Sequence, residues 1–337
     1  MSLTKDTWTI SAGLLQFPGT RRDGTRLQDS SPELWFDDLV EVASVGFTTA
    51  EVGDGWLRAG DLSESQLALL SDAARQAGIG LTSVAVIRTS IIDPVNAAEN
   101  LAYSHRAIDA AAALGSRVVS FGLHRELTPQ QRQQLWFWTV DGATDDPADR
   151  DSWNLAVASF RELGDHAASL GLEVSLEMYE DTYLGTADSA VRLITDIGLD
   201  NVGLNPDLGN LIRLHRPVES WEELVEKTVP YANYWHIKNY FRDEDAAAGT
   251  YFATPAPLEL GVVNYRWAIK EALRAGFTGA FVCEHYGGDG LSVSASNQEY
   301  LRRQVLPKRD GYTLGTSFVA QDGSELASAP ATLASAP

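Results

Sequence analysis

The stretch "DSWNLAVASFRELGDHAASLGLEVSLEMY", residues 151–179, shows the pattern on which the fold prediction rests. Its first part, 151–171, is amphipathic, begins on an aspartate and ends on a glycine, which are usual start and stop signals of a helix. Its second part, 172–179, alternates apolar and polar residues as a strand does. The stretch therefore predicts a helix followed directly by a strand.

The alternation of strand and helix continues along the chain, with further amphipathic helices expected at 31–46 and 63–78. Eight strand-like segments favour a closed (β/α)8 TIM barrel, an α/β fold, over the alternative of an open doubly wound sheet. No predicted strand is followed by a G-x-G-x-x-G turn, which weakens a dinucleotide-binding open sheet. The predicted strands are residues 7–15, 47–53, 80–88, 117–124, 172–179, 201–207, 232–239 and 279–286.

We expect one barrel domain over residues 1–310, with insertions at 123–151 and 240–262, and an extended or disordered tail at 311–337. Both insertions follow carboxyl ends of predicted strands, the face on which barrel enzymes build catalytic sites. Long loops at that face are usually functional. The tail is rich in Ala, Ser and Pro from about Ser324 and lacks core-forming residues, so we expect it not to fold.

Composition and charge exclude several classes of protein. Of the 337 residues 44% are hydrophobic, which is enough for a large core in one barrel or two smaller domains. The 26 Lys and Arg residues against 46 Asp and Glu give a formal net charge of −20, which repels phosphate backbones and argues against nucleic-acid binding. A single cysteine, Cys283, excludes an intramolecular disulfide and suits a reducing compartment. With no signal-peptide pattern and no membrane-span pattern, we expect a cytoplasmic protein.

Four ionisable residues lie near the carboxyl ends of four successive predicted strands: Glu177, Asp207, His236 and Glu284. The first two intervals, 30 and 29 residues, each span one strand–helix unit, and the third, 48 residues, is lengthened by the second insertion. Their strand neighbours on the opposite face are apolar, so the four side chains are expected to face the barrel interior. Three carboxylates this close repel one another unless a cation lies between them. Oxygen and imidazole donors favour Mn²⁺, then Mg²⁺, Co²⁺ or Zn²⁺.

Such a site supports proton abstraction next to a carbonyl. A bound metal polarises the ketone and its neighbouring hydroxyl, and a carboxylate accepts the proton. Returning the proton to the neighbouring carbon isomerises the sugar, and returning it from the opposite face epimerises it. Expulsion of a β-substituent instead makes the enzyme a lyase. The residues themselves leave these three outcomes open.

Over roughly residues 8–308 the chain resembles the sugar phosphate isomerase/epimerase family of xylose-isomerase-like TIM barrels. The segments that carry the resemblance are "GFTTAEVGDGW", "VSLEMYE", "GLNPDLGN", "WHIKN" and "FVCEHYG". The resemblance implies that Glu177 and Glu284 also act as an acid/base pair across the substrate. It further implies one divalent metal bound by Glu177, Asp207, His236 and Glu284.

Other residues are expected around the substrate. The resemblance implies that Lys238 and Arg242 bind substrate oxygens. Asn210 stands where many of these epimerases have a histidine three residues after the metal aspartate, and we place it in the substrate-binding set. His124 shares strand parity with pocket-facing positions, so it is a candidate for either a second acid/base or a substrate hydrogen bond. Glu51, at the end of the second predicted strand, is expected to bind a substrate hydroxyl.

The remaining candidates are expected outside the site. Glu180 is placed on the loop surface, and strand parity points His285 away from the centre. The other three histidines fall in predicted helices or loops and are expected at the surface: His105, His166 and His215.

Trp136, Phe137 and Trp138 form an aromatic run in the first insertion. They either fasten the insertion as a local hydrophobic patch or form a lid over a ring-shaped substrate, with Trp136 and Trp138 in contact with it. The large subunits of C-glycoside deglycosidases, which this chain also resembles, cleave 3-keto glycosides of flat aromatic aglycones and work with a small β-sandwich partner. The alternative function is therefore such a lyase. We expect a homo-oligomer, or a hetero-oligomer with a small partner subunit.

Two other classes are weaker. An endonuclease IV-like DNA repair enzyme uses a similar barrel, but it needs a histidine-rich zinc cluster and a basic groove, and this chain has six histidines and a net charge of −20. A catalytically inactive scaffold is argued against by the intact set of four candidate ligands.

Overall fold

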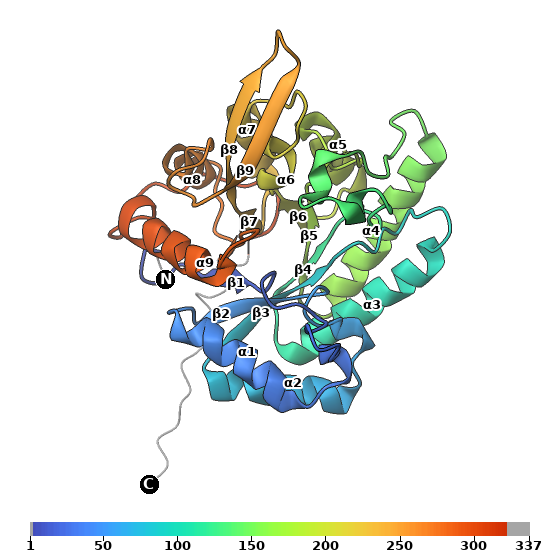
Figure 1. Cartoon of the computed structure of the whole chain (residues 1–337), viewed down its shortest axis with the longest axis vertical. Coiled ribbons are helices and arrows are strands. Elements are labelled where there is room, and N and C mark those ends of the chain that lie inside the picture. The colour runs from blue at the N-terminus through green and yellow to red at the C-terminus, as the bar shows by residue number, and fades with distance from the viewer. Residues whose placement is uncertain (1–2, 322–337) are drawn as a thin grey trace.

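Eight parallel strands form the centre of the protein. In the computed structural model, which describes residues 3–321, they make one sheet in the order β6-β5-β4-β3-β2-β1-β10-β7 (Figure 1). All eight predicted strands are present, each shorter than its prediction. They are β1 (Ile10–Gly13), β2 (Thr49–Gly53), β3 (Gly80–Val86), β4 (Val118–Phe121), β5 (Glu173–Glu177), β6 (Val202–Asn205), β7 (Trp235–Ile237) and β10 (Phe281–Cys283).

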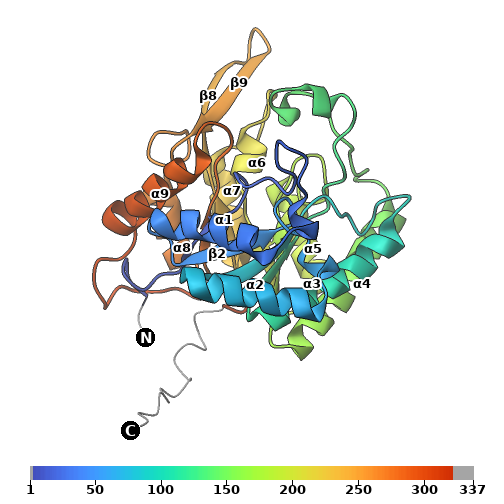
Figure 2. The same cartoon turned by 60° about the horizontal axis from the view of Figure 1, so that its bottom comes forward.

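Helices cover the outside of this sheet, so the prediction of an α/β barrel is confirmed (Figure 2). In α2 a reciprocal pair of hydrogen bonds between Ser63 and Gln66 caps the start, and Gly78 ends the helix in the left-handed conformation that suits glycine. The predicted helices at 31–46, 63–78 and 151–171 correspond to α1, α2 and α4. The helices are α1 (Pro32–Ser44), α2 (Glu64–Ala77), α3 (Ala97–Leu114), α4 (Arg150–Ser169), α5 (Ala187–Ile197), α6 (Gly209–Ile212), α7 (Trp221–Thr228), α8 (Tyr265–Arg274) and α9 (Gly290–Tyr300).

The sheet is nearly closed, and its seam lies between β6 and β7. Within residues 3–321 one isolated bridge joins Leu204 of β6 to Ala232, three residues before β7. A side chain completes the seam above this bridge: the Asn205 Oδ1 atom accepts a hydrogen bond from the His236 backbone N–H at 2.7 Å. Both residues are buried, so this bond replaces a missing rung of the ladder.

The same seam is closed from below by residues 318–321. Phe318 and Ala320 donate backbone hydrogen bonds to the carbonyls of Pro230 and Asp200, at 2.9 and 2.8 Å. These two carbonyls lie just before β7 and β6, so this segment links the amino ends of both strands. The Ala/Ser/Pro-rich tail predicted from about Ser324 lies outside the described residues.

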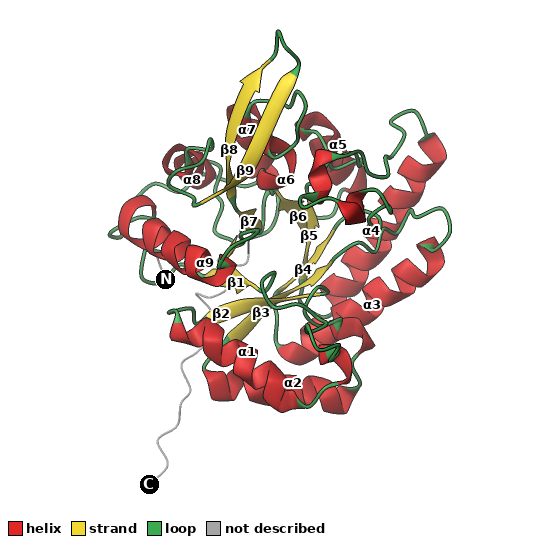
Figure 3. Cartoon of the chain, in the orientation of Figure 1, coloured by secondary structure: helices red, strands yellow, loops and turns green. Residues whose placement is uncertain are grey.

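The two predicted insertions have different structures. Residues 240–262 hold an antiparallel hairpin, β8 (Asn239–Asp245) paired with β9 (Thr250–Ala256), which projects from the barrel (Figures 1 and 3). Residues 123–149 are irregular apart from two short 3₁₀ turns, Gln131–Gln133 and Phe137–Thr139. No helix in the part of the chain that is described is long and apolar enough to cross a membrane.

The seam generates a stability prediction. Asn205→Ala should lower the free energy of unfolding by about 1–3 kcal/mol, because it leaves the buried His236 N–H without an acceptor. Thermal unfolding of the two proteins measures the difference. Asn96→Ala is the matched control, since Asn96 is exposed and its side chain makes no cap bond to α3. Equal melting temperatures for wild type and Asn205→Ala would contradict a role in closing the seam.

Candidate metal centre

The four residues singled out from the sequence meet at the carboxyl end of the barrel. Glu177 is the last residue of β5, and Asp207 lies two residues after β6. His236 is the middle residue of β7, and Glu284 directly follows β10. All four are buried, with exposed fractions between 0% and 8%.

Oxygens of the three carboxylates surround one ring nitrogen of the histidine. His236 Nδ1 lies 3.9 Å from Glu177 Oε1, 4.0 Å from Asp207 Oδ2 and 3.5 Å from Glu284 Oε1. Neither His236 Nδ1 nor Asp207 Oδ1 has a hydrogen-bond partner, although both atoms are buried. Bonds of about 2.1 Å would place neighbouring ligand atoms about 3 Å apart, so small rotations suffice to enclose an ion. The cluster fits a divalent metal ion.

Glu51 contacts the His236 ring at Nε2, the nitrogen that faces away from the other three carboxylates. His236 Nε2 lies 3.0 Å from Glu51 Oε2, and the same oxygen accepts hydrogen bonds from Tyr234 at 2.7 Å and Ser83 at 3.2 Å. An Nε2–H that donates to Glu51 leaves the Nδ1 lone pair for a metal, an arrangement found behind many metal-binding histidines. The expected contact of Glu51 with a substrate hydroxyl stays a prediction, and the contact observed is the one with His236. Tyr234 was missed, although it has the strand parity of His236.

Lys238 and Asn210 hold the carboxylates from the side. The Lys238 ammonium donates to Asp207 Oδ2 at 2.5 Å and to Glu284 Oε2 at 2.6 Å. The Asn210 amide donates to Glu177 Oε1 at 2.8 Å and to Asp207 Oδ2 at 3.1 Å. Both residues therefore lie at the centre, where they orient the candidate ligands.

The pKa shifts at the centre indicate that its buried carboxylates need a positive charge nearby. Burial would lower the pKa of His236, but the charges of Glu51 and Glu284 outweigh it and raise that pKa well above its usual value. Burial raises the pKa of Asp207 to about 7 despite the nearby Lys238 ammonium. For Glu177, burial acts upward, but the nearby charge of a protonated His236 outweighs it and lowers its pKa. A divalent ion would supply this charge and displace the His236 proton.

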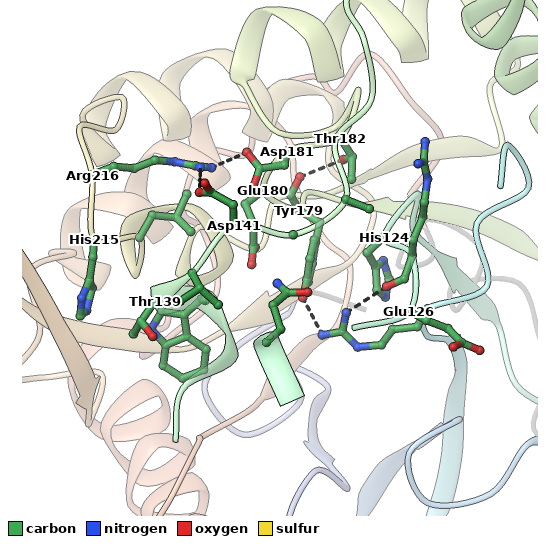
Figure 4. Close-up of a pocket in the computed structure, with 18 residues that line it drawn as sticks. His124, Glu126, Thr139, Asp141, Tyr179, Glu180, Asp181, Thr182, His215 and Arg216 are labelled. Atoms are coloured by element: carbon green, nitrogen blue, oxygen red, sulfur yellow. Dashed lines mark hydrogen bonds and ion pairs between the residues drawn. The ribbon is translucent and has the colours of Figure 1, made fainter. Parts of the chain in front are cut away.

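A small cavity of about 90 Å³ lies next to His124, between the first insertion and the loops after β5 and α6 (Figure 4). His124 is 2% exposed, stacks on Tyr179 with ring centroids 4.5 Å apart, and has no partner for Nδ1. Burial lowers the pKa of His124 to about 4, so its imidazole is neutral at neutral pH. The cavity is lined by Arg88, Gln131, Trp138, Glu180 and Thr182, among other side chains.

The aromatic run packs into a cluster at the mouth of the barrel. Trp138 is 3% exposed, stacks on Trp136 at 4.9 Å and meets the edges of Tyr240 and Tyr286 at 5.7 and 5.3 Å. These contacts fasten the insertion to the hairpin and to the loop after β10. Trp136 stays half-buried, and the lid interpretation applies best to it.

The expectation that Glu180 lies on the loop surface is wrong, whereas the expected substrate contact of Arg242 stays a prediction. Glu180 is not on the loop surface: it is 6% exposed, and both of its oxygens lie 3.0 Å from Nη2 of the fully buried Arg213. The Arg242 guanidinium does not point at the four candidate ligands. Its guanidinium donates to the backbone carbonyls of Ile212, Leu214 and Arg216, which fixes the loop after α6 beneath the hairpin.

Arg213 also lies beside the aromatic cluster, although the sequence did not indicate a role for it. Its charge lies within 4.8 to 5.7 Å of the ring centres of Phe137, Trp138, Tyr179 and Tyr286, and its Nε and Nη1 atoms have no hydrogen-bond partner. The other histidines lie outside the donor set. His215 contacts the backbone of Ala253, His285 keeps a buried Nδ1 without a partner, and His105 and His166 form a pair between α3 and α4.

The fold and the buried centre together define a parallel (β/α)8 barrel with a site for a divalent ion. Residues 39–304 match the xylose isomerase-like TIM barrel family, and the chain belongs to that family. A xylose isomerase-like TIM barrel protein from Mycobacterium smegmatis, solved in complex with magnesium, is 45% identical. The match has a TM-score of 0.85 and covers 90% of this chain and 98% of that one.

More distant structures share the fold. D-psicose 3-epimerase from Clostridium cellulolyticum H10, solved with D-tagatose, is 17% identical with a TM-score of 0.62, and the match covers 89% of this chain and 99% of that one. The 3-keto-D-glucoside 4-epimerase from E. coli is 15% identical with a TM-score of 0.59, and the match covers 88% and 99% of the two chains. No curated protein matches the chain.

The position of Glu51 generates a prediction about metal affinity. Glu51→Gln keeps the shape of the side chain but removes the charge behind His236, so we expect divalent-metal binding to weaken by roughly 10- to 100-fold. Titration calorimetry with Mn²⁺ measures the change. Glu99→Gln, on the exposed face of α3, is the control and should bind Mn²⁺ as wild type does. An unchanged affinity in Glu51→Gln would show that the histidine does not need this partner.

Proposed function

We propose that this protein is a divalent-metal-dependent enzyme of the sugar isomerase/epimerase type, which abstracts a proton next to the carbonyl of a keto-sugar or keto-glycoside. One observation carries the proposal. A buried imidazole nitrogen without a hydrogen-bond partner lies 3.5 to 4.0 Å from oxygens of three buried carboxylates, at the catalytic end of the barrel.

We propose that Glu177, Asp207, His236 and Glu284 hold the ion, with Mn²⁺ as the first choice. The magnesium complex of the Mycobacterium smegmatis relative supports a hard divalent ion, and the oxygen-rich donor set agrees with it. When bound, the ion polarises the substrate carbonyl and its neighbouring hydroxyl. The single cysteine, buried and free, suits a cytoplasmic enzyme.

Glu177 and Glu284 are the proposed acid/base pair. They come from β5 and from the end of β10, so they approach the centre from different sides of the barrel. Each keeps one oxygen toward His236 Nδ1 while a neighbour orients the carboxylate: Asn210 donates to Glu177, and Lys238 donates to Glu284. A carboxylate held in this way can accept the proton on carbon without losing its orientation. His124, neutral and buried, is the proposed hydrogen-bond partner of a substrate oxygen.

Proton exchange with solvent tests this chemistry whatever the final product is. Wild-type enzyme loaded with Mn²⁺ should exchange the C–H next to the carbonyl of a ketose probe such as D-psicose or D-tagatose with deuterium from D₂O, followed by NMR. Glu177→Gln and Glu284→Gln keep an oxygen donor but lose the proton acceptor, so exchange should fall by roughly 10²-fold or more.

Metal content measured on the same samples separates loss of the base from loss of the ion. Glu99→Gln, which alters an exposed carboxylate on α3, is the matched control and should exchange at the wild-type rate. Near-wild-type exchange in both glutamate variants would reject the proton-abstraction mechanism.

A second candidate is a C-glycoside deglycosidase that cleaves a 3-keto aryl glycoside by elimination, together with a small partner subunit. The aromatic cluster of the first insertion favours it, because Trp138 lines the cavity beside His124. The half-buried indole of Trp136 offers a surface on which an aromatic aglycone can stack.

Trp136 distinguishes the two candidates. Stacking on an indole contributes roughly 1 kcal/mol, so Trp136→Ala should weaken turnover of a 3-keto aryl glycoside several-fold and leave that of a free keto-sugar nearly unchanged. Trp138→Phe is the companion variant, because Trp138 packs inside the cluster and its loss should affect both substrates through the lid. Equal losses for both substrates in Trp136→Ala would show that this indole only holds the insertion in place.

A further inference from the structure

A cluster of four titratable side chains lies outside the catalytic end of the barrel. His105 and Asp109 are four residues apart on α3, and Glu162 and His166 are four residues apart on α4. Residues at this spacing lie on one face of a helix. The two helices run side by side on the outside of the barrel (Figures 1 and 2), and these two faces meet.

The four side chains form a continuous chain of contacts. His105 Nδ1 lies 2.8 Å from His166 Nδ1, so the two rings face each other through the same kind of nitrogen. The other nitrogen of each ring contacts a carboxylate of the opposite helix. His105 Nε2 lies 2.9 Å from Glu162 Oε1, and His166 Nε2 lies 3.0 Å from Asp109 Oδ1.

Two neutral imidazoles carry too few N–H groups for these contacts, so the arrangement needs a cation. Each ionised carboxylate accepts a hydrogen bond from an Nε2–H group, and a neutral imidazole carries only one N–H. Both Nδ1 atoms of His105 and His166 are then bare lone pairs that face each other at 2.8 Å. Either a proton or a metal ion between them removes the repulsion.

We propose that His105 and His166 form a second metal site, which binds a borderline divalent transition-metal ion such as Zn²⁺, Ni²⁺ or Cu²⁺ through their Nδ1 atoms. Imidazole is a preferred ligand of these ions. A carboxylate on the far nitrogen of each ring fixes the tautomer that leaves Nδ1 free, as it does behind many metal-binding histidines.

The geometry leaves room for the ion. Metal–nitrogen bonds of about 2.0 Å in a tetrahedral site place the two nitrogens about 3.3 Å apart, so the pair must open by about half an ångström. The two imidazoles are 27% and 26% exposed, which lets them rotate and lets an ion enter from solvent. Water molecules complete the shell, while Asp109 and Glu162, with side chains 63% and 59% exposed, stay at the Nε2 atoms on the far side of each ring. This site is rich in nitrogen, whereas the catalytic centre is rich in oxygen, so the two should select different ions.

Zinc binding in the full-length His236→Ala variant tests the proposal. His236→Ala removes the imidazole of the catalytic centre and makes the result independent of the proposed function. Titration calorimetry with Zn²⁺ should still find one equivalent bound in His236→Ala. That equivalent should weaken at least tenfold when His105→Gln and His166→Gln are added. Glu162→Gln, which removes only a partner of His105, should weaken it by roughly 10- to 100-fold.

A second readout and a control complete the design. Zn²⁺ in excess should raise the melting temperature of His236→Ala by a few degrees and leave the variant that also carries His105→Gln and His166→Gln unchanged, because the ion stabilises only the folded state. His215→Gln, which removes a half-buried histidine elsewhere, should bind Zn²⁺ like its parent. Equal Zn²⁺ affinity with and without the two histidines would overturn the proposal and show that a proton alone bridges the pair.

Discussion

The crowding of buried negative charge around one histidine is the constraint on which the rest of the structure depends. Glu51, Glu177, Asp207 and Glu284 all lie within 4.0 Å of a His236 ring nitrogen. Carboxylates taken out of water at this density are stable only when cations and hydrogen bonds compensate them. Lys238, directly after β7, and the neighbouring Tyr234 and Asn210 donate hydrogen bonds to these carboxylates and orient them, while Asp207 Oδ1 keeps no partner among the described residues.

The centre lies at the seam of the barrel. His236 belongs to β7. Within the described part of the chain one isolated bridge, from Leu204 of β6 to Ala232 just before β7, joins the two edges of the sheet, and Asp207 lies two residues after β6. The Asn205 side chain takes over the hydrogen bond that a regular ladder would give to the His236 backbone. Residues 318–321 join the amino ends of the same two strands from below. Because no regular ladder joins the two strands here, the backbone can be irregular at Asp207 and direct this side chain toward the centre. The hydrogen bonds of Asn205 and of residues 318–321 hold the two strands together.

The strands and the four converging residues were predictable from the sequence because both follow from local rules. Strand parity decides which face a residue such as Glu177 takes, and parallel connection brings strand ends to one side of the barrel. The partners of Glu180, Arg213 and Arg242 were not predictable, because these contacts depend on how the loops and the hairpin fold over the barrel. Arg242 lies on a hairpin strand that folds back over the loop after α6, and Glu180 meets an arginine 33 residues away. Neither contact leaves a periodic signal in the sequence.

A count of charges indicates why one glutamate of the centre can act as a base. Glu51, Glu177, Asp207 and Glu284 bring four negative charges when ionised, and Lys238 brings one positive charge, while Glu180 and Arg213 neutralise each other nearby. A divalent ion would leave a surplus of one negative charge in a site that burial keeps from water. Acceptance of a proton by Glu177 or Glu284 would then remove charge from the centre instead of adding it. The same burial would thus favour the proposed proton abstraction once an ion is bound.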